Sequence, residues 1–302
     1  VLPDHRAAGR DGHKGVAMAR TKTVPPEGLL SDQEYTSVIV SYSNGIDSTG
    51  ALYWATKNFP KEKIYLLYCD TGCEYPENTA MFYKVAAFMG VRPVLVLDAR
   101  GFLGLLLNER LKFPDMKNRW CTAYLKTAVT DKWIRQHRRQ LGTKCLFVSG
   151  ERRDESAGRA KLPELEYHST TLKTKRVADF TCHWYRPCLD YEKGKMFEQG
   201  RELKLEPHPC YEYVGRCSCM FCMFMPERHA AENMKRYPEM AAEYVRAEMK
   251  VQHTWKKAKS LQSIFNECMD IDDVDEDMRQ EFRQLSLFDG IEGDQSVADG
   301  DP

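Results

Sequence analysis

A loop of small polar residues, Ser43-Asn44-Gly45-Ile46-Asp47-Ser48, has the composition of an anion-binding corner. It follows a short apolar run and precedes a segment typical of a helix start. At such a corner the backbone N–H groups and the positive end of the helix dipole point at one place. Ser43 and Ser48 add hydroxyl donors, and Gly45 allows close approach of the backbone. We therefore expect a phosphate-binding pocket here, with an ordinary strand-to-helix turn as the alternative.

Clustered cysteines are the second candidate for chemistry. Of the eleven cysteines, Cys210, Cys217, Cys219 and Cys222 fall within thirteen residues, and Cys121 lies far upstream. Four thiolates can hold a 4Fe–4S cluster or a structural zinc ion. Several close cysteines with one distant partner favour the iron–sulfur cluster. A zinc clip and buried free thiols are the alternatives.

A third group of candidates is carboxylates, glycines and arginines in two short segments. Asp70-Thr71-Gly72 places a carboxylate before a tight turn, which suits a ribose, an adenine or a metal, although an N-cap turn has the same composition. The segment from Gly150 to Arg159 contains Arg152, Ser156 and Arg159. Guanidinium groups grip phosphate or sulfate oxygens in a planar, bidentate manner. A charged surface loop is the alternative for this segment.

The elements that must position these residues alternate between strand and helix from about residue 36. Continuous apolar runs predict strands at 38–42, 64–69, 93–97 and 145–149, and helical spacing predicts helices at 48–57, 76–89 and 123–141. Such strands indicate a Rossmann-like α/β fold, with a parallel sheet covered by helices on both faces. Ligands of such sheets bind at the carboxyl ends of the strands. Ser43, Asp70, Asp98 and Gly150 all follow predicted strand ends.

The chain divides into four parts by composition. We expect a disordered N-terminal segment at 1–35, a nucleotide-binding domain with the cysteine cluster at 36–225, a helical extension at 226–269 and an acidic, flexible tail at 270–302. Within the extension we expect a helix at 238–260 and a second one at 261–269. The acidic run that follows is best interpreted as solvated.

Composition restricts the class of protein. The 302 residues are 42% hydrophobic and have a net charge of zero, so bulk charge does not indicate nucleic acid or a membrane surface. No apolar run is long enough to cross a bilayer, and the first 35 residues lack the apolar stretch of a signal peptide. We expect a cytoplasmic protein whose clustered cysteines serve metal or redox chemistry rather than disulfides. No lysine follows Gly50, which excludes a Walker-type loop.

The motifs together resemble a known superfamily. The pattern S-x-G-x-D-S at 43–48 resembles the pyrophosphate loop of the ATP pyrophosphatases, also called adenine nucleotide alpha hydrolases, with Asn44 where that superfamily usually has glycine. The segments at 70–79, 150–159 and 185–190 resemble, in order, motifs of the phosphoadenosine phosphosulfate (PAPS) reductase branch. The resemblance covers about residues 38–225. It implies an adenine nucleotide alpha hydrolase-like fold that binds ATP with Mg²⁺.

The resemblance also implies roles for single residues. Catalytic roles are implied for Asp47, Arg152 and Arg159. Nucleotide binding is implied for Ser43, Asn44, Gly45, Asp47, Ser48, Asp70, Gly72, Gly150, Arg152 and Ser156.

The cysteine spacing resembles one subfamily within this branch. Cys121, in an R-W-C-T-x-x-L-K segment, followed by Cys210-x8-Cys219-x2-Cys222, is similar to the ligand pattern of the iron–sulfur sulfurtransferases of DNA phosphorothioation. This similarity implies that Cys121, Cys210, Cys219 and Cys222 hold a 4Fe–4S cluster. Cys217 is the spare, which could replace Cys210 or Cys219.

The implied activity is adenylation of a substrate oxygen followed by sulfur transfer, with DNA as acceptor and a cysteine desulfurase or another sulfur donor as partner. A PAPS or adenylyl-sulfate reductase is the first alternative. Assimilatory PAPS reductases carry E-C-G-x-H, whereas this chain has only Glu267-Cys268-Met269. Adenylyl-sulfate reductases use adjacent cysteines, which are also missing. A non-catalytic, metal-binding module associated with DNA is the second alternative.

A pentapeptide in the acidic tail indicates a possible partner. Gln284-Leu285-Ser286-Leu287-Phe288 resembles the peptide by which bacterial polymerases and repair proteins bind the DNA sliding clamp. Leu287 and Phe288 would fill an apolar pocket, Gln284 would form hydrogen bonds, and the tail would act as a tether. A short turn that folds back onto the body is the alternative.

Overall fold

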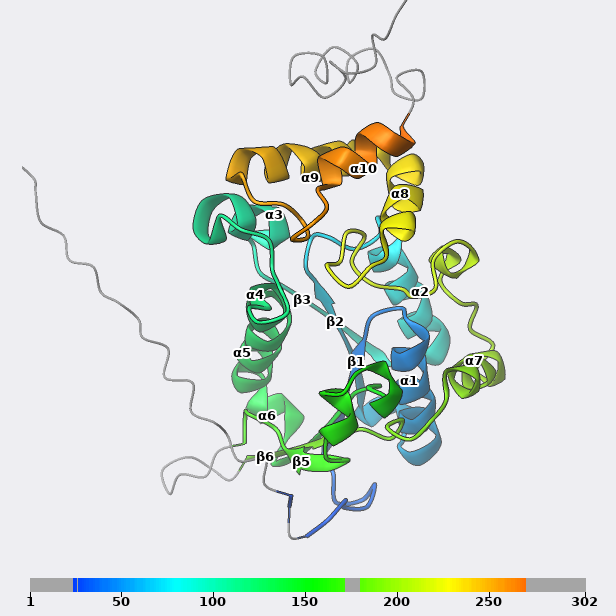
Figure 1. Cartoon of the computed structure of the whole chain (residues 1–302). Helices are drawn as coiled ribbons and strands as arrows, with labels where there is room; N and C mark the ends of the chain where they lie inside the picture. The colour runs from blue at the N-terminus through cyan, green and yellow to red at the C-terminus, as the bar shows by residue number, and fades with distance from the viewer. Residues whose placement is uncertain (1–23, 26, 172–179, 270–302) are drawn as a thin grey trace, which may run out of the picture.

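A six-stranded sheet forms the centre of the molecule in the computed structural model, which describes residues 24–25, 27–171 and 180–269 (Figure 1). The strand order is β3-β2-β1-β4-β6-β5, and every pair is parallel except β5 with β6. The strands are β1 (Ser37–Tyr42), β2 (Ile64–Asp70), β3 (Arg92–Leu97), β4 (Lys144–Val148), β5 (Leu165–Tyr167) and β6 (Thr181–Tyr185). The α/β fold class predicted from the sequence is therefore confirmed.

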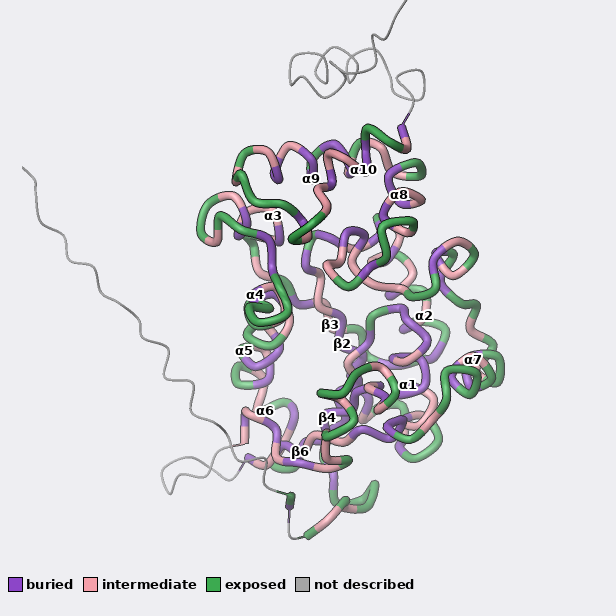
Figure 2. Tube along the Cα trace, viewed as in Figure 1, coloured by how far each residue is buried: buried purple, intermediate pink, exposed green. Residues whose placement is uncertain are grey.

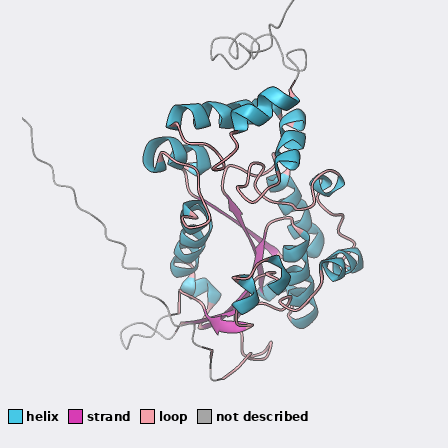
Figure 3. Ribbon diagram, viewed as in Figure 1, coloured by secondary structure: helices cyan, strands magenta, loops and turns pink. Residues whose placement is uncertain are grey.

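Helices cover both faces of the sheet, as Figure 3 shows. One face packs against α1 (Ile46–Asn58) and α2 (Asn78–Met89), where Val38 and Val40 share a core with Leu52 and Phe82. The opposite face packs against α5 (Val129–Gln136) and α6 (Arg138–Leu141), where Ile39 shares a core with Ile134. Neighbouring residues of β1 enter different cores because successive side chains of a strand point to opposite faces.

The remaining helices lie around this sheet. They are η1 (Lys61–Lys63), α3 (Gly101–Leu105), η2 (Leu106–Arg110), α4 (Trp120–Thr122), η3 (Ala123–Ala128), η4 (Arg153–Glu155), η5 (Arg159–Lys161), α7 (Lys193–Glu202) and η6 (Pro209–Glu212). Of these, η2 and η3 are π-helical, and η3 continues into α5 without a break. Among the described residues, no helix is both long enough and apolar enough to span a membrane.

The helical extension contains α8 (Glu227–Arg236), α9 (Pro238–Val251) and α10 (Leu261–Cys268), which lie together at the top of Figure 1. These helices share one buried core with α3, with Trp120 and with the cysteine segment around Cys210 and Met220. Figure 2 shows the buried residues on the inner sides of these helices. The extension therefore packs directly on the part of the chain that contains the cysteines.

One predicted helix end was wrong, and two strands were not predicted. The helix expected at 238–260 ends at Val251, because Gln252 adopts a left-handed conformation with φ of 50°. The side chain of Glu248 then accepts the N–H of Trp255 at 2.5 Å, which holds the chain in a non-helical turn. The sequence also gave no sign of β5 and β6, because these short strands lack a continuous apolar run.

Candidate active site

The loop between β1 and α1 is held in a closed form by its own side chains. The N–H of Ser43 donates to the Ser48 hydroxyl at 3.1 Å, and that hydroxyl donates to the carbonyl of Gly45 at 2.7 Å. Asn44 is left-handed, with φ of 57°, and its amide donates to the carbonyl of Asn78 at 2.8 Å. Asn44 thus fixes the loop to α2, which explains how this position functions without glycine.

A second segment lies directly over this loop. The N–H of Ile46 donates to the hydroxyl of Tyr211 at 3.1 Å. A Cβ atom placed on Gly45 would lie 3.7 Å from that hydroxyl and 3.7 Å from the carbonyl oxygen of Cys217. The segment with the cysteines therefore forms one wall of the space that the loop faces.

Asp47 connects the loop to the arginine segment after β4. The Nε of Arg152 donates to Asp47 at 2.8 Å, and its Nη1 also donates to Asp154. The Arg152 side chain is only 7% exposed, so this guanidinium is fixed between two carboxylates. Gly150 lies against the loop so closely that a Cβ would be 1.9 Å from the carbonyl oxygen of Asp47.

These elements enclose a cavity of about 510 Å³ at the carboxyl edge of the sheet. Among the predicted site residues, those that line it are Ser43, Gly45, Asp47, Ser48, Gly150, Arg159, Cys121, Cys219 and Cys222. Three further cations and three further thiols also line it: Arg119, Lys126, Arg216, Cys69, Cys73 and Cys217. The structure therefore places the loop at 43–48 and the cysteines on one shared cavity.

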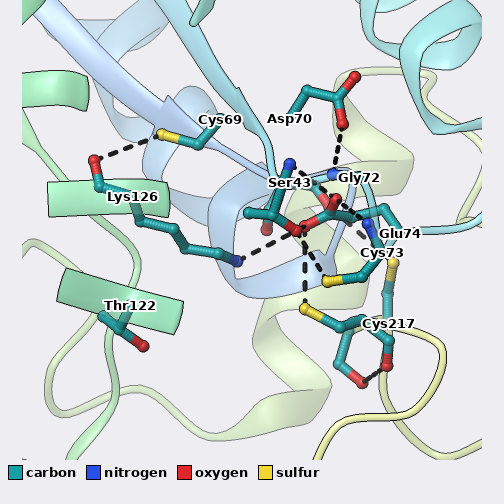
Figure 4. Close-up of polar contacts among 12 residues, drawn as sticks. Ser43, Cys69, Asp70, Gly72, Cys73, Glu74, Thr122, Lys126 and Cys217 are labelled. Carbon is teal, nitrogen blue, oxygen red and sulfur yellow. Dashed lines mark hydrogen bonds and ion pairs between the residues drawn. The ribbon is translucent and has the colours of Figure 1, made fainter. Parts of the chain in front are cut away.

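The other predicted residues are not among those that line the cavity. Asp70 accepts the N–H of Gly72 at 2.9 Å and so completes a turn (Figure 4). The hydroxyl of Ser156 accepts the N–H of Arg159 at 3.2 Å. Asp98 pairs with Arg100 at 2.6 Å, away from the cavity. Asn44 and Arg152 support the loop from behind, and Cys210 is fully buried.

Cys210 and Cys217 form one thiol pair. Their sulfurs lie within 4.8 Å of each other and of a ring nitrogen of His208. A hydrogen bond from Cys217 lowers the pKa of Cys210 to about 6, and His208 contributes in the same direction. The same contact raises the pKa of Cys217. Of the two thiols, Cys210 is thus the one that favours the thiolate form.

Cys73 and Cys219 form a second pair, together with Glu74. The ligand atoms of these three residues lie within 4.8 Å of one another. A hydrogen bond from Cys73 lowers the pKa of Cys219 and raises that of Cys73. Figure 4 shows Lys126 reaching from η3 to Glu74, with Nζ 3.9 Å from the carboxylate oxygen. Burial lowers the pKa of Lys126, but the negative charges of Cys219 and Glu74 raise it by more. The net pKa is therefore raised, and the ammonium stays charged.

The described residues offer two groups that could each hold a metal ion: Cys210 and Cys217 with His208, and Cys73 and Cys219 with Glu74. Cys121, Cys219 and Cys222 line the same cavity, and burial together with the charge of Cys219 raises the pKa values of Cys121 and Cys222. Cys210 and Cys219 are the members of their pairs with lowered pKa values, and metals bind the thiolate form. Of the four predicted ligands, Cys121, Cys219 and Cys222 line the cavity, whereas Cys210 is buried beside Cys217. Cys210 and Cys219 belong to different groups, and Cys121 and Cys222 stand outside both.

The sequence did not indicate Cys73, Glu74 or Lys126 as part of this site. Cys73 and Glu74 stand beside the recognised D-T-G turn, but their spacing to other cysteines has no pattern. Lys126 lies on a π-helix, an element that is frequent at functional sites. Tertiary packing brings them together: η3 lies beside β2, so that Lys126 reaches Glu74, and Cys73 and Glu74 meet Cys219.

Two solved structures resemble this chain weakly, both in sequence and in structure. A PAPS reductase from Candida auris, solved as a phosphate complex, has 13% sequence identity and a TM-score of 0.41 over 61% of this chain and 84% of its own. An FMN adenylyltransferase from Candida glabrata, solved with FMN and an ATP analogue, has 10% identity and a TM-score of 0.34 over 56% of this chain. The match spans 49% of that second protein.

Comparison of the sequence itself gives a clearer result. No curated protein matches this chain significantly. The phosphoadenosine phosphosulfate reductase domain model matches residues 37–214, which is more than half of the chain and includes the loop, the arginine segment and Cys210. The chain therefore belongs to the phosphoadenosine phosphosulfate reductase domain family.

Proposed function

We propose that this protein is an ATP pyrophosphatase that adenylates a substrate oxygen and then directs sulfur to the activated position. The observation that carries this proposal is the shared cavity, in which the anion-binding loop and the thiols of Cys121, Cys219 and Cys222 face one space. A nucleotide held at the loop would thus meet a sulfur source without leaving the site.

The residues of the cavity have separate tasks in the first step. The loop N–H groups and the hydroxyl of Ser43 bind the β- and γ-phosphates. A substrate oxygen bonds to the α-phosphorus, the bond to the bridging oxygen breaks, and pyrophosphate leaves. Arg159 and Lys126 stabilise the charge that grows on the leaving group, which is the main catalytic contribution in phosphoryl chemistry. Mg²⁺ would bind to the phosphate oxygens of the nucleotide and neutralise part of their charge.

In the second step a sulfur atom bonds to the activated atom and AMP leaves. A 4Fe–4S cluster, when bound, would supply thiophilic iron and electrons for this sulfur chemistry. Cys121, Cys210, Cys219 and Cys222 would hold it. Lys126 and Glu74 would form an ion pair beside these ligands, and Glu74 would contact the sulfur of Cys219.

Metal content tests the ligand assignment. Protein prepared without oxygen should contain about four irons per chain, with a broad brown absorbance. Cys222→Ala should lose most of this iron, because it removes a thiolate from the cavity wall. Cys268→Ala is the matched control, since that half-buried thiol lies on α10 and contacts the carbonyl of Ala231 instead. One zinc per chain in place of iron would contradict the assignment.

Turnover tests the adenylation step. The iron-loaded protein should convert ATP to AMP and pyrophosphate when an acceptor is present, and a sulfur donor such as a cysteine desulfurase should add sulfur to that acceptor. DNA is the acceptor that we propose. PAPS reduction is the second candidate, favoured by the family assignment and by Arg159 and Arg216 in the cavity. Release of sulfite from PAPS with thioredoxin, and no pyrophosphate from ATP, would select that reaction.

Recruitment to DNA by the sliding clamp is a separate proposal. The pentapeptide Gln284-Leu285-Ser286-Leu287-Phe288 lies outside the described residues. We expect purified clamp to bind the full chain and to lose most of its affinity for a Leu287→Ala, Phe288→Ala double variant, because these side chains supply the apolar contact. Equal binding of both proteins would reject the proposal.

A further inference from the structure

Cys217 lies between the loop at 43–48 and the neighbouring cysteine Cys210. Its Sγ lies 3.9 Å from the carbonyl oxygen of Ser43, the first residue of the anion-binding loop. Its own carbonyl oxygen lies against Gly45, at 3.7 Å from a Cβ position there. Its sulfur also lies close to that of Cys210. In the sequence, Cys217 comes two residues before Cys219. Figure 4 shows Cys217 beside Ser43 in this arrangement.

Cys69 and Cys73 also line the cavity and are not proposed ligands, but their sulfurs contact other parts of the chain. Cys69 is half-buried like Cys217, but its sulfur contacts the hydroxyl of Thr130 at 3.3 Å, on the α5 side of the cavity. Cys73 is buried and its sulfur lies 2.8 Å from the Thr71 hydroxyl. Of these three thiols, Cys217 is the one whose sulfur contacts the loop that would hold the phosphates.

We propose that Cys217 is the sulfur carrier of this enzyme, which accepts a sulfane sulfur as a persulfide and delivers it to the adenylated substrate. This inference rests on the proposed function and assigns a residue to its second step. Cys217 has the required position because an atom activated by a nucleotide on the Ser43 loop would lie next to its sulfur. A half-buried thiol at a cavity wall is also accessible to a donor.

Each step balances in atoms and electrons. In loading, the Cys217 sulfur bonds to the terminal sulfur of a donor persulfide, the donor S–S bond breaks, and the donor leaves as a thiol with the proton of Cys217. In delivery, the terminal sulfur of the Cys217 persulfide bonds to the activated atom, and the bond to the AMP oxygen breaks. A dithiol reductant then supplies two electrons, cleaves the remaining S–S bond and restores the Cys217 thiol while it becomes a disulfide.

Mass spectrometry of the full-length, iron-loaded protein tests the assignment. The protein is incubated without oxygen with glutathione persulfide, all thiols and persulfides are alkylated, and the cysteine peptides are sequenced. We expect one additional sulfur atom on Cys217. Cys217→Ser should lose this label and the transfer of sulfur to the acceptor, yet keep its iron. Cys69→Ser, the exposure-matched control in the same cavity, should keep both the iron and the label on Cys217.

Three results would overturn the proposal: the additional sulfur on a cysteine other than Cys217, no additional sulfur on the wild-type protein, or loss of iron from Cys217→Ser, since that would make Cys217 a ligand. Pyrophosphate release is measured in the same samples to separate this inference from the proposed function. Release of pyrophosphate without label on Cys217 rejects the carrier alone. Label on Cys217 without release of pyrophosphate supports the carrier and rejects the adenylation step.

Discussion

Asp47→Asn should reduce the release of pyrophosphate from ATP by about 10²–10³-fold, which is the usual effect of removing one preorganised electrostatic contact from an active site. Asp47 stands in the first turn of α1 and fixes the guanidinium of Arg152 at 2.8 Å. Without the carboxylate charge, Arg152 keeps Asp154 as a charged partner and has only a weaker, neutral acceptor at position 47, so it can reorient toward the phosphates. We also expect a loss of about 1–3 kcal/mol in the free energy of unfolding, because a charged hydrogen bond is weakened.

Asp190→Asn is the matched control for this experiment. Asp190 pairs with Arg153, the neighbour of Arg152, also at 2.8 Å, but the Asp190 side chain is 78% exposed. An exposed pair contributes at most about 1 kcal/mol, so stability and turnover should stay close to the wild type. Steady-state pyrophosphate assays and urea unfolding measure both variants. If Asp47→Asn binds and cleaves ATP like the wild type, the loop does not work as proposed, and the non-catalytic module becomes the better explanation.

Gly150→Ala should abolish nucleotide binding and reduce the free energy of unfolding by about 3 kcal/mol, the upper part of the range for overpacked sites. A Cβ at this position would lie 1.9 Å from the carbonyl oxygen of Asp47 and 2.4 Å from its carbonyl carbon. These are backbone atoms of the loop-to-helix corner, so no side-chain rotation can relieve the overlap. The corner must move as a whole, and its N–H groups move with it.

Gly194→Ala provides the contrast, because no atom lies within 4 Å of its Cβ position in α7. Alanine there should stabilise the protein by about 0.5–1 kcal/mol, since it reduces the entropy of the unfolded chain. Urea unfolding and calorimetric titration with a non-hydrolysable ATP analogue measure both variants. Wild-type affinity in Gly150→Ala would mean that the loop after β4 does not define the position of the Ser43 loop.

Local patterns were sufficient to predict four of the six strands and the edge of the sheet at which the cavity lies. Continuous apolar runs identified β1, β2 and β4, because buried parallel strands need apolar side chains on both faces. The run at 93–97 also identified β3, although this strand lies at the edge of the sheet and is only partly buried. The loop at 43–48 was found from its residue types and its place between strand and helix. The antiparallel edge strand β5 and its neighbour β6 were missed, because their pairing depends on partners more than on their own residues.

Tertiary packing decided what the cysteines and charges do. The sequence left Cys217 as a possible substitute for Cys210, whereas the structure gives Cys210 the lowered pKa and places Cys217 against the loop. Likewise, Lys126 and Glu74 are far apart in the sequence and meet only because η3 packs on β2, beside the D-T-G turn. The conformation of a strand-to-helix loop depends mainly on neighbouring residues, because steric limits and backbone hydrogen bonds act over short distances in the sequence. Contacts between distant side chains exist only once a shared core, here the one around Cys210, Met220 and α9, has fixed the elements that carry them.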